Sequence, residues 1–495
     1  MKYRFVLFLG ISLLLFGCKK TSDQNGGSKA AFENDSLSFE AGVKLSEDEI
    51  AFDKKLARLR KQIVEKAGEQ SLDLNNKSFE EIKPFAESGK LYEILKRMPK
   101  GGLLHSHSGG LTDIKWVIET AKKYEECYVF LQSDGKDYIF GQLAFFKKGT
   151  APQGFVSLRR KILEEPPFEN KLYELLTLKR KTLCAQVNYW IEFEKRFRRI
   201  GLLLSYRPFF TAYYKKAMYD LTEDNIQHLE IRFFFGNLYD FQHGEYGAET
   251  AITDLEEILK EVQKTKQFSL KIIYTSFKFL DNKQIEEQLE KAFQLKKKFP
   301  EIISGFDLVA DEASGNSISY FQESWSALSA LSKKYGAEMP LFLHAGESNS
   351  VFNKNIEDVS LLNNRRVGHG LNLIYFPQAM NRIKQQNELV EVSPISNQTL
   401  GYVSDMRNHP ARVLLRSGVQ CSVNSDDPGV FGYEGLSYDF WMIVVYWELD
   451  LKALKKLVFN SLNYSSLNEN EKQPALDYLE KEWLLFIEQA NQKLD

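Results

Sequence analysis

The sequence predicts an α/β fold, a (β/α)₈ barrel in which eight parallel strands alternate with helices. Eight short apolar runs recur after residue 100, each followed by a helix-like stretch, and this is the pattern of repeated parallel βα units. Several runs end in His, Asp or Glu, as PLFLHAGE (340–347) does. Because side chains at the carboxyl ends of barrel strands converge on one mouth, these strand ends predict a shared site. A chain of 495 residues accommodates one such barrel with insertions.

Composition excludes one class of partner. The chain is 43% hydrophobic, which suffices for a large core, and its 65 Lys and Arg residues nearly balance 67 Asp and Glu residues, for a net charge of −2. A nucleic-acid-binding protein shows a basic excess or a basic stripe. We therefore expect no nucleic-acid partner.

The N-terminal segment predicts export. Two basic residues precede an apolar run, 5–16, that ends at Gly17-Cys18; the run is too short to span a bilayer and indicates the core of a signal peptide. The residues LFGC resemble a bacterial lipobox, which predicts a lipoprotein signal peptide over 1–17 and lipidation of Cys18. An ordinary secretory signal with a chance Cys is the alternative. The polar, Gly/Ser-rich residues 18–40 predict a flexible tether.

We therefore expect an exported protein that is lipid-anchored to a bacterial membrane, on its periplasmic or cell-surface side, with no other membrane contact. The remaining cysteines are Cys127, Cys184 and Cys421, and an odd number in an exported protein leaves at least one free thiol. A Cys127–Cys184 disulfide is one option, because both residues fall in the same inserted region. No C-x-x-C occurs, which removes the zinc-ribbon and cytidine-deaminase types of zinc site.

The elements follow in order along the chain. Residues 41–95 are rich in Glu, Lys and Leu with helix-like spacing, so they predict a helical N-terminal extension of two or three helices. The barrel domain occupies 96–495, with an insertion at about 125–190 whose first part is irregular or β-rich. The predicted strands are LLHSH (103–107), IQHLEIRFFF (226–235), SLKIIYTSF (269–277), IISGFDLVADE (302–312), PLFLHAGE (340–347), RRVGHGL (365–371), LVEVSPISN (389–397) and VQCSVNSDD (419–427).

Histidines gather at the predicted strand ends. His105 and His107 are two apart, so on a strand they point to the same face. An H-x-H alone is common by chance, but four of the seven histidines, these two with His344 and His369, lie at strand ends. Asp426 follows the eighth strand. Three histidines and one carboxylate (His105, His107, His344 and Asp426) suit a single Zn²⁺ with a position open for water, whose pKa the metal lowers toward neutrality.

Three further residues near these strand ends suit hydrolytic chemistry. Glu347 lies three residues after His344, where a carboxylate off the metal can shuttle a proton. His369 can orient the attacking water. Asp427 can bind a ring nitrogen of a substrate, although an Asp before Pro428 also suits a helix N-cap.

Eight motifs occur in one order between about Met98 and Asp439: MPKGGLLHSH, HLEIR, GFDLVADE, LFLHAGES, RVGHG, EVSPISNQTL, RNHP and NSDDP. This set resembles the adenosine deaminase family, and most closely its secreted branch, the adenosine deaminase-related growth factors. The resemblance implies a (β/α)₈ barrel of the metal-dependent hydrolase type, one Zn²⁺ per chain and a purine nucleoside as partner. It implies hydrolysis of adenosine or 2′-deoxyadenosine to the inosine product and ammonia, and it suggests a homodimer through the N-terminal helices.

The resemblance also assigns roles by motif. His105, His107, His344 and Asp426 match the zinc ligands. Glu347 matches the proton-shuttling glutamate that also meets purine N1, His369 matches the histidine that positions the hydroxide, and Asp427 matches the residue that bonds N7.

Two positions depart from the family pattern. Relatives follow H-x-H with an acidic residue that helps to bind the ribose, whereas this chain has Ser108, whose neutral hydroxyl gives a weaker hydrogen bond. The fourth strand of many relatives ends in a Gly whose N–H approaches the purine, and here Ala310 takes that place. Trp190 and Glu194 lie where the growth-factor branch contributes pocket residues, although for Trp190 we favour a core aromatic.

These departures leave alternatives open. The substrate could be another 6-aminopurine nucleoside or an aminated heterocycle. A non-catalytic nucleoside-binding protein of the same fold is a second alternative, but the complete set of ligands with Glu347 argues against it. A two-metal amidohydrolase is less favoured, because no Lys stands at the end of the fourth strand to bridge two metals.

Overall fold

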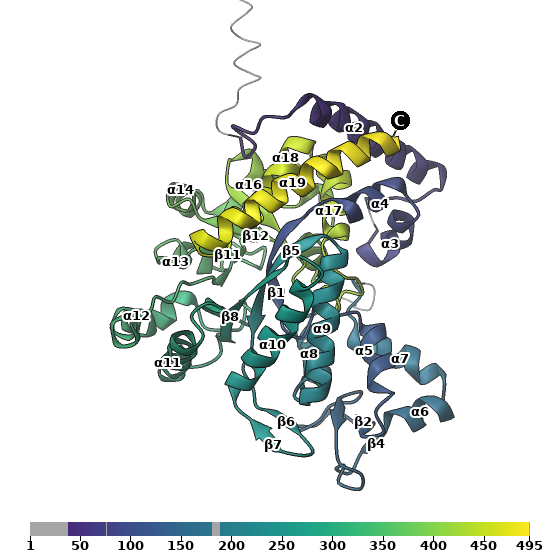
Figure 1. Ribbon diagram of the computed structural model, residues 1–495, viewed down its shortest axis with the longest axis vertical. Helices are drawn as coiled ribbons and strands as arrows, with labels where there is room; N and C mark the ends of the chain where they lie inside the picture. The colour runs from purple at the N-terminus through teal and green to yellow at the C-terminus, as the bar shows by residue number, and fades with distance from the viewer. Residues whose placement is uncertain (1–37, 76, 181–188, 495) are drawn as a thin grey trace, which may run out of the picture.

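The computed structural model describes residues 38–75, 77–180 and 189–494 (Figure 1). The predicted signal peptide, the lipidation site Cys18 and the tether up to residue 37 lie outside these ranges, and so does Cys184. Cys127 and Cys421 are buried free thiols, so Cys127 does not form the suggested disulfide with Cys184. Within the described ranges, no helix combines the length and the apolar character needed to cross a membrane.

Eight parallel strands form the centre of the molecule. They are β1 (Gly101–His107), β5 (Ile226–Phe233), β8 (Ser269–Phe277), β9 (Ile303–Val309), β10 (His344–Ala345), β11 (Arg366–His369), β12 (Leu389–Val392) and β13 (Gln420–Val423). They pair as two four-stranded sheets, β1-β5-β8-β9 and β10-β11-β12-β13. Isolated parallel bridges join the sheets at both seams, Phe306 to Leu341 and Ser106 to Asp426. This cyclic order is consistent with the predicted barrel.

Six of the eight predicted strands are shorter in the structure, and two of them show the reason. β12 ends at Val392 and Pro394–Thr399 form helix α15, because Pro394 has no N–H for a ladder and suits the first turn of a helix. Of the predicted strand 340–347, only His344–Ala345 is regular. Pro340 opens that run, and Gly346 ends it with a φ of 72°, a conformation that glycine adopts without strain.

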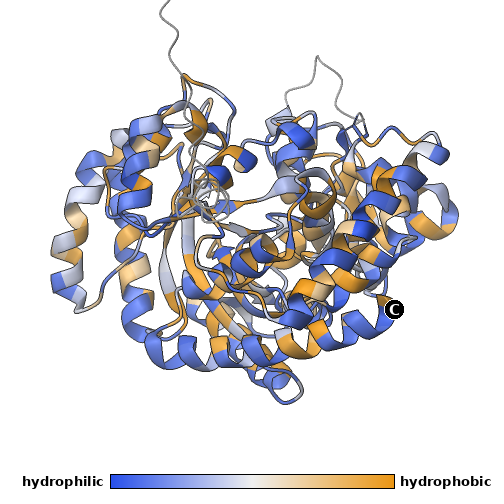
Figure 2. Cartoon of the chain, turned by 90° about the horizontal axis from the view of Figure 1, so that it is seen from above, coloured by the Kyte–Doolittle hydropathy of each residue, from blue (hydrophilic) through white to orange (hydrophobic). Residues whose placement is uncertain are grey.

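Helices surround the strands. Those that follow the barrel strands or lie between them are α5 (Ile114–Ala121), α8 (Tyr189–Leu204), α9 (Arg207–Glu223), α10 (Ala248–Gln263), α11 (Asn282–Lys298), α12 (Gln322–Tyr335), α13 (Asn355–Val359), α14 (Pro377–Gln385), α16 (Ala411–Arg416) and α17 (Ser437–Tyr446). α17 is buried at every position. Along other helices of the chain, hydrophilic and hydrophobic residues alternate (Figure 2). This is the pattern of helices that cover a core with one face.

The N-terminal extension packs against the C-terminal helices. Helices α2 (Glu47–Glu69), α3 (Phe79–Glu87) and α4 (Lys90–Arg97) lie in the range predicted to be helical, and α2 runs beside α19 (Glu469–Leu494) (Figure 1). Glu49 of α2 is buried and accepts hydrogen bonds from Trp483 of α19 (2.7 Å) and Lys455 of α18 (Leu451–Asn463) (2.8 Å). α18 also covers the start of β1, where Ser461 accepts a bond from the N–H of Gly102.

The insertion lies at the opposite end of the molecule from α2 and α19 (Figure 1). It contains an antiparallel sheet of β2 (Cys127–Phe130), β3 (Leu143–Phe145) and β4 (Phe155–Ser157), followed by α6 (Leu158–Glu164) and α7 (Pro167–Leu176). A two-stranded hairpin, β6 (Leu238–Asp240) with β7 (Gly244–Tyr246), lies near it. The α2–α19 pair thus lies on the side where the barrel strands begin, and the insertion on the side where they end.

Candidate metal centre and active site

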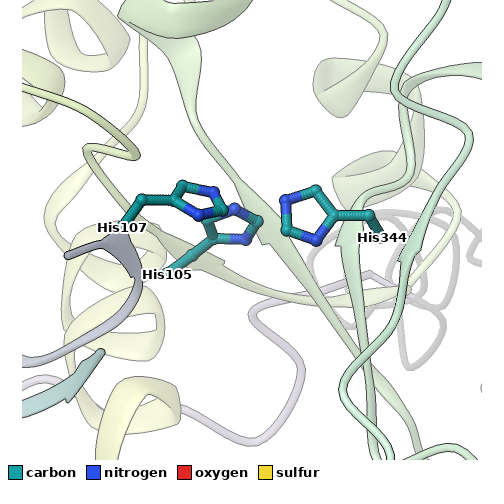
Figure 3. Close-up of side chains that lie close together, drawn as sticks. All are labelled: His105, His107 and His344. Atoms are coloured by element: carbon teal, nitrogen blue, oxygen red, sulfur yellow. The ribbon is translucent and has the colours of Figure 1, made fainter. Parts of the chain in front are cut away.

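The predicted ligands meet at the carboxyl ends of the strands. Imidazoles of His105 and His107, from β1, converge with that of His344, from β10 (Figure 3), and one ligand nitrogen of each lies within 4.8 Å of the others. Asp426 follows β13, and its Oδ1 is 3.1 Å from Nε2 of His107 and 3.4 Å from Nε2 of His105. The structure therefore brings together all four residues proposed as zinc ligands.

Unsatisfied atoms at this cluster fit a metal ion. His105 Nε2 and Asp426 Oδ1 are buried and form no hydrogen bond within the described residues. A buried polar atom without a partner loses about 1–3 kcal/mol of solvation, so such atoms need a bound group. Imidazole nitrogen and carboxylate oxygen are donors that Zn²⁺ accepts. The residues present therefore fit the implied metal.

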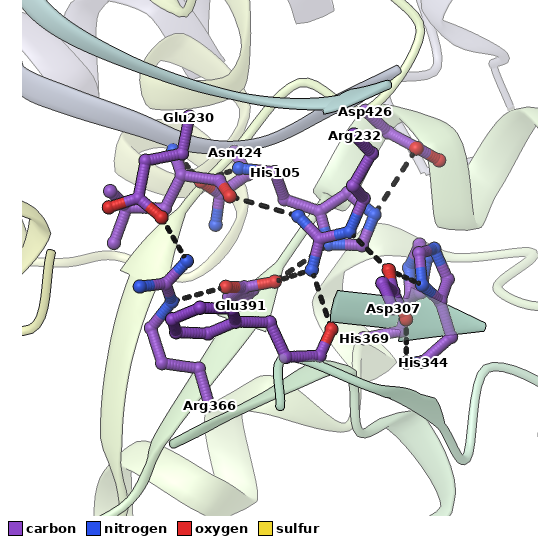
Figure 4. A network of polar contacts seen from close by, with 12 residues as sticks. His105, Glu230, Arg232, Asp307, His344, Arg366, His369, Glu391, Asn424 and Asp426 are labelled. Carbon is purple, nitrogen blue, oxygen red and sulfur yellow. Dashed lines mark hydrogen bonds and ion pairs between the residues drawn. The ribbon is translucent and has the colours of Figure 1, made fainter. Parts of the chain in front are cut away.

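Carboxylates behind the histidines set the ring orientations (Figure 4). Glu391 lies 2.9 Å from Nδ1 of His105, and Asp307 lies 2.7 Å from Nδ1 of His344 and accepts a bond from its backbone N–H. A carboxylate on one ring nitrogen fixes the tautomer and turns the other nitrogen toward a metal. Nε2 of His105 and of His344 is therefore the atom left for the metal.

Two buried arginines connect these carboxylates. Arg232 donates to Asp307 (2.6 Å) and to Glu391 (2.7 Å), and Arg366 bonds the other oxygen of Glu391 and Glu230 (2.6 Å) (Figure 4). All five side chains are 1% exposed or less. Burial raises the pKa of Glu391, but Arg232 and Arg366 outweigh it and hold the pKa well below its usual range. The network thus keeps an ionised carboxylate behind His105.

Glu347 is held at the cavity by a second buried ion pair. Lys278, at the end of β8, donates to Glu312 (2.7 Å) and to the backbone oxygen of His344 (2.8 Å). Glu312 in turn accepts a bond from the backbone N–H of Glu347 (3.1 Å). Glu347 Oε1 lies 3.6 Å from Nε2 of His369. The pair therefore fixes the backbone on which a metal ligand and the predicted proton shuttle both stand.

Asp427 faces the same cavity and does not cap a helix. It lies in a turn, and the next helix, α17, begins at Ser437, so the N-cap alternative is wrong. Asp427 is 1% exposed, and its Oδ1 has no hydrogen-bond partner among the described residues. A Cβ at Gly110 would lie 2.0 Å from that oxygen, so Gly110 leaves the space that the Asp427 side chain occupies.

Burial and neighbouring charges shift the pKa values of these groups in different directions. Burial raises the pKa of Glu347 well above its usual range, and nearby Asp426 raises it further; the same two causes raise the pKa of Asp427. Burial lowers the pKa of His344 and His369 well below the usual value. Burial also raises the pKa of Asp426, but the neighbouring histidines outweigh it, so the net pKa is well below its usual range. The site thus combines a carboxyl whose pKa is lowered, Asp426, with two whose pKa is raised, Glu347 and Asp427.

A cavity of about 810 Å³ opens from the cluster toward α8. Ser108 and Ala310, predicted to contact substrate, line it. Trp190 and Glu194 of α8 line it as well, with a 2.9 Å bond between their side chains. Trp190 is half-buried at the cavity, so the expectation of a core aromatic does not describe it.

Sequence comparison identifies the family. The family model described as "Adenosine deaminase" matches residues 184–482, more than half of the chain. The chain belongs to the adenosine deaminase family. It is 31% identical over 462 residues to "Adenosine deaminase 2" of Sus scrofa, covering 90% of this chain and 89% of that protein. It is 30% identical to "Adenosine deaminase 2-A" of Danio rerio, covering 97% and 99%.

Solved structures of more distant proteins share the fold. The N6-methyl-AMP deaminase of Arabidopsis thaliana superposes with a TM-score of 0.57 at 16% identity, covering 79% of this chain and 98% of that one. An amidohydrolase from Burkholderia ambifaria, solved with bound Zn, superposes with a TM-score of 0.53 at 13% identity, covering 81% and 94%. These likenesses show that the chain shares its fold with both proteins.

Sequence reasoning did not assign the residues behind the ligands. Each of these residues carries a charge inside an otherwise apolar predicted strand, and that contrast is the feature that marks them. They are Glu230 and Arg232 in HLEIR, Asp307 in GFDLV, Arg366 in RRVGH and Glu391 in LVEVS. A charge in a buried strand needs a partner, but the strand pattern does not say which charges pair.

Ala310 stands in a strained conformation. Its φ is 128°, a region that residues other than glycine enter at a cost of about 1–3 kcal/mol. We expect Ala310→Gly to raise the melting temperature measured by calorimetry and to increase the free energy of unfolding by about 1 kcal/mol. The relief of strain exceeds the free-energy cost of the greater chain entropy of glycine in the unfolded state, which is about 0.5–1 kcal/mol. Ala330→Gly, on the exposed face of α12, should lower the free energy of unfolding by about 1 kcal/mol. A lower melting temperature for Ala310→Gly would contradict the strain argument.

Proposed function

We propose that the protein is a zinc-dependent adenosine deaminase that converts adenosine and 2′-deoxyadenosine to inosine and 2′-deoxyinosine, with release of ammonia. The observation that carries the proposal is the cluster of His105, His107, His344 and Asp426, in which His105 Nε2 and Asp426 Oδ1 have no hydrogen-bond partner within the described residues. His107, His344 and Asp426 line the same cavity as Glu347 and Asp427. Family membership supports it, as do relatives that are named adenosine deaminase.

The four ligands would hold one zinc ion per chain, and the ion would activate a water for attack on C6 of the purine. In the overall reaction the water oxygen bonds to C6, the C6–N bond breaks, and the amino group leaves as ammonia with a proton from the water. Glu347 has the position to protonate ring N1, where that proton stays, and to carry a second proton, released by the water, to the leaving amino group. His369, whose Nε2 lies 3.6 Å from Glu347 Oε1, would orient that water through a hydrogen bond.

Two other groups hold the purine. Asp427 lines the cavity, and its Oδ1, which has no hydrogen-bond partner within the described residues, can bond ring N7. The backbone N–H of Ala310 stands at the end of β9 beside the cavity. Together with Glu347 they would contact the edge of the base, so that the carbon bearing the amino group points to the metal cluster.

An ultraviolet assay tests the reaction. The chain from Lys19 onward is purified, loaded with zinc and mixed with adenosine. We expect an absorbance change with stoichiometric ammonia, abolished by a chelator and restored by zinc. No turnover by protein that carries one zinc per chain would overturn the proposal.

Asp426→Ala tests the fourth ligand. Because Asp426 supplies the only carboxylate of the proposed set, its loss should lower the zinc content per chain after dialysis to well below one, measured by plasma mass spectrometry. Asp137→Ala, in an exposed loop, is the matched control and should keep full zinc. Full occupancy in Asp426→Ala would show that the ligand is misassigned.

Export and the lipid anchor at Cys18 belong to this proposal, and their support is the signal-like sequence of residues 1–18. Mass spectrometry of the membrane fraction should find a lipidated Cys18, and Cys18→Ala should release the protein from the membrane.

The proposed homodimer rests on the resemblance to the growth-factor branch. Light scattering on the soluble chain tests it, because a monomer mass would contradict it.

A further inference from the structure

The cavity has a polar end and an apolar end. At one end lie the metal cluster, Glu347 and Asp427; the remaining wall comes largely from α8 and from the ends of β5 and β8. Because the reacting carbon must lie at the polar end, the part of a substrate farthest from its amino group meets this second wall. The chemistry of that wall therefore selects the distal part of the substrate.

Apolar side chains enclose the wall next to the cluster; we call Phe197, Ile200, Tyr214 and Phe233 the apolar wall. A Cβ at Gly109 would lie 3.2 Å from Phe197 and 3.7 Å from Ile200, so the segment after His107 packs directly on them. The Tyr214 hydroxyl donates to the backbone oxygen of Ser108 (2.9 Å), and its ring lies 5.9 Å from that of Phe233. All four side chains line the cavity.

Polar atoms of the chain next to these four side chains are mostly occupied, although Glu194, Ser205 and Asn237 also line the cavity. The Ser108 N–H donates to the backbone oxygen of Arg232 (3.0 Å) and its oxygen takes the Tyr214 bond, which leaves the neutral hydroxyl. Two cations also line the cavity. Lys195 pairs with Asp134 and Glu192, each at 3.1 Å, and Arg198 donates to the backbone oxygens of Gly135 and Lys136. Lys195 is thus paired with two carboxylates, whereas Arg198 is exposed and bonds only backbone oxygens within the described residues.

The rim of the cavity continues the apolar surface. Phe234, Phe277 and Phe279 form a stack with ring centroids 4.6 and 4.7 Å apart. Phe279 is 61% exposed and Phe277 is 36% exposed. The volume of about 810 Å³ is toward the upper end of the roughly 300–1,000 Å³ of small-molecule sites. The wall thus has room for an apolar group beyond the sugar.

We propose that the preferred substrate is a 6-aminopurine nucleoside whose sugar carries an apolar substituent, such as a thioether, in place of a hydroxyl or a phosphate. This inference rests on the proposed function and specifies its substrate. An apolar group on the wall gains burial of about 25 cal/mol per Å², whereas a hydroxyl or a phosphate placed against these four side chains loses hydration without a matching partner there. The reaction is unchanged: C6–O forms, C6–N breaks and ammonia leaves.

The experiment compares kcat/KM of the zinc-loaded protein for three nucleosides. They are adenosine, 5′-deoxy-5′-(methylthio)adenosine and adenosine 5′-monophosphate. We expect the methylthio compound to exceed adenosine by roughly tenfold or more, the discrimination that an extra apolar group gives in a hydrophobic pocket. We expect the monophosphate to fall below adenosine by a larger factor.

Two variants test whether the apolar wall sets this substrate preference. Ser108→Asp places a carboxylate at the apolar wall, so the ratio of methylthio compound to adenosine should fall at least severalfold. Ser329→Asp, on the exposed face of α12, makes the same chemical change away from the cavity and should leave the ratio as it is. An unchanged ratio in Ser108→Asp would contradict the role of this wall.

Failure of this inference and failure of the proposed function would give different results. Turnover of adenosine equal to or faster than that of the methylthio compound would overturn this inference and leave the proposed function standing. Absence of turnover with all three nucleosides, with zinc bound, would overturn both.

Discussion

Glu347→Gln is expected to lower kcat by about 10²–10⁴-fold while the protein keeps its zinc, because a glutamine cannot shuttle the proton that leaves with ammonia. The amide is close to the carboxyl in size, and Glu347 is not among the proposed ligands. It lies 3.6 Å from His369, and its backbone N–H still donates to Glu312. The geometry should therefore survive, and kcat and kcat/KM should fall together.

The measurement pairs steady-state kinetics with the zinc content of the same preparation. Glu323→Gln, at an exposed position in the first turn of α12, is the matched control and should retain wild-type turnover and metal. Near-wild-type turnover in Glu347→Gln would remove Glu347 from the mechanism. Loss of zinc in that variant would instead make Glu347 part of the metal site.

Arg232→Met is expected to destabilise the protein by about 3–5 kcal/mol, because it removes one partner from buried ion pairs and leaves carboxylates without a counter-charge. Arg232 is fully buried and bonds Asp307 and Glu391, as well as the backbone oxygens of Leu104 and Phe342. Since those two carboxylates hold the Nδ1 atoms of His344 and His105, zinc affinity should fall as well, by about 10–100-fold.

Urea unfolding of the zinc-free protein and competitive zinc titration measure the two effects separately. Arg407→Met removes an exposed pair with Asp405 and should cost less than about 1 kcal/mol. If Arg232→Met does not fold, Arg232→Lys keeps the charge but not the fork of donors and should still bind zinc more weakly than the wild type. Wild-type stability and zinc affinity in Arg232→Met would show that the network does not support the site.

Local patterns located most of the site. The alternation of apolar runs and helical stretches placed all eight barrel strands, because periodicity is a property of a few consecutive residues. His105, His107, His344 and Asp426 could be chosen because few other residues combine a strand-end position with a metal-binding side chain. The structure then brought these four together.

Other features could not be derived from local patterns. Asp427 before Pro428 has the local form of a helix start, but its carboxyl faces the cavity, because no helix follows it there. Trp190 has the residue type of a core aromatic, but α8 brings it to the cavity wall. In both cases the position of the neighbouring element decided the environment of the side chain.

The sequence by itself determined the strand–helix order, the polar strand ends and the chemical identity of the donors, because each is encoded within a short segment. Only the tertiary structure decided which buried charges pair. Glu391 is 286 positions from His105 and 159 from Arg232, and Asp307 is 75 from Arg232. Such pairs form because strands distant in the sequence lie side by side in the barrel, where burial leaves each charge dependent on its neighbour.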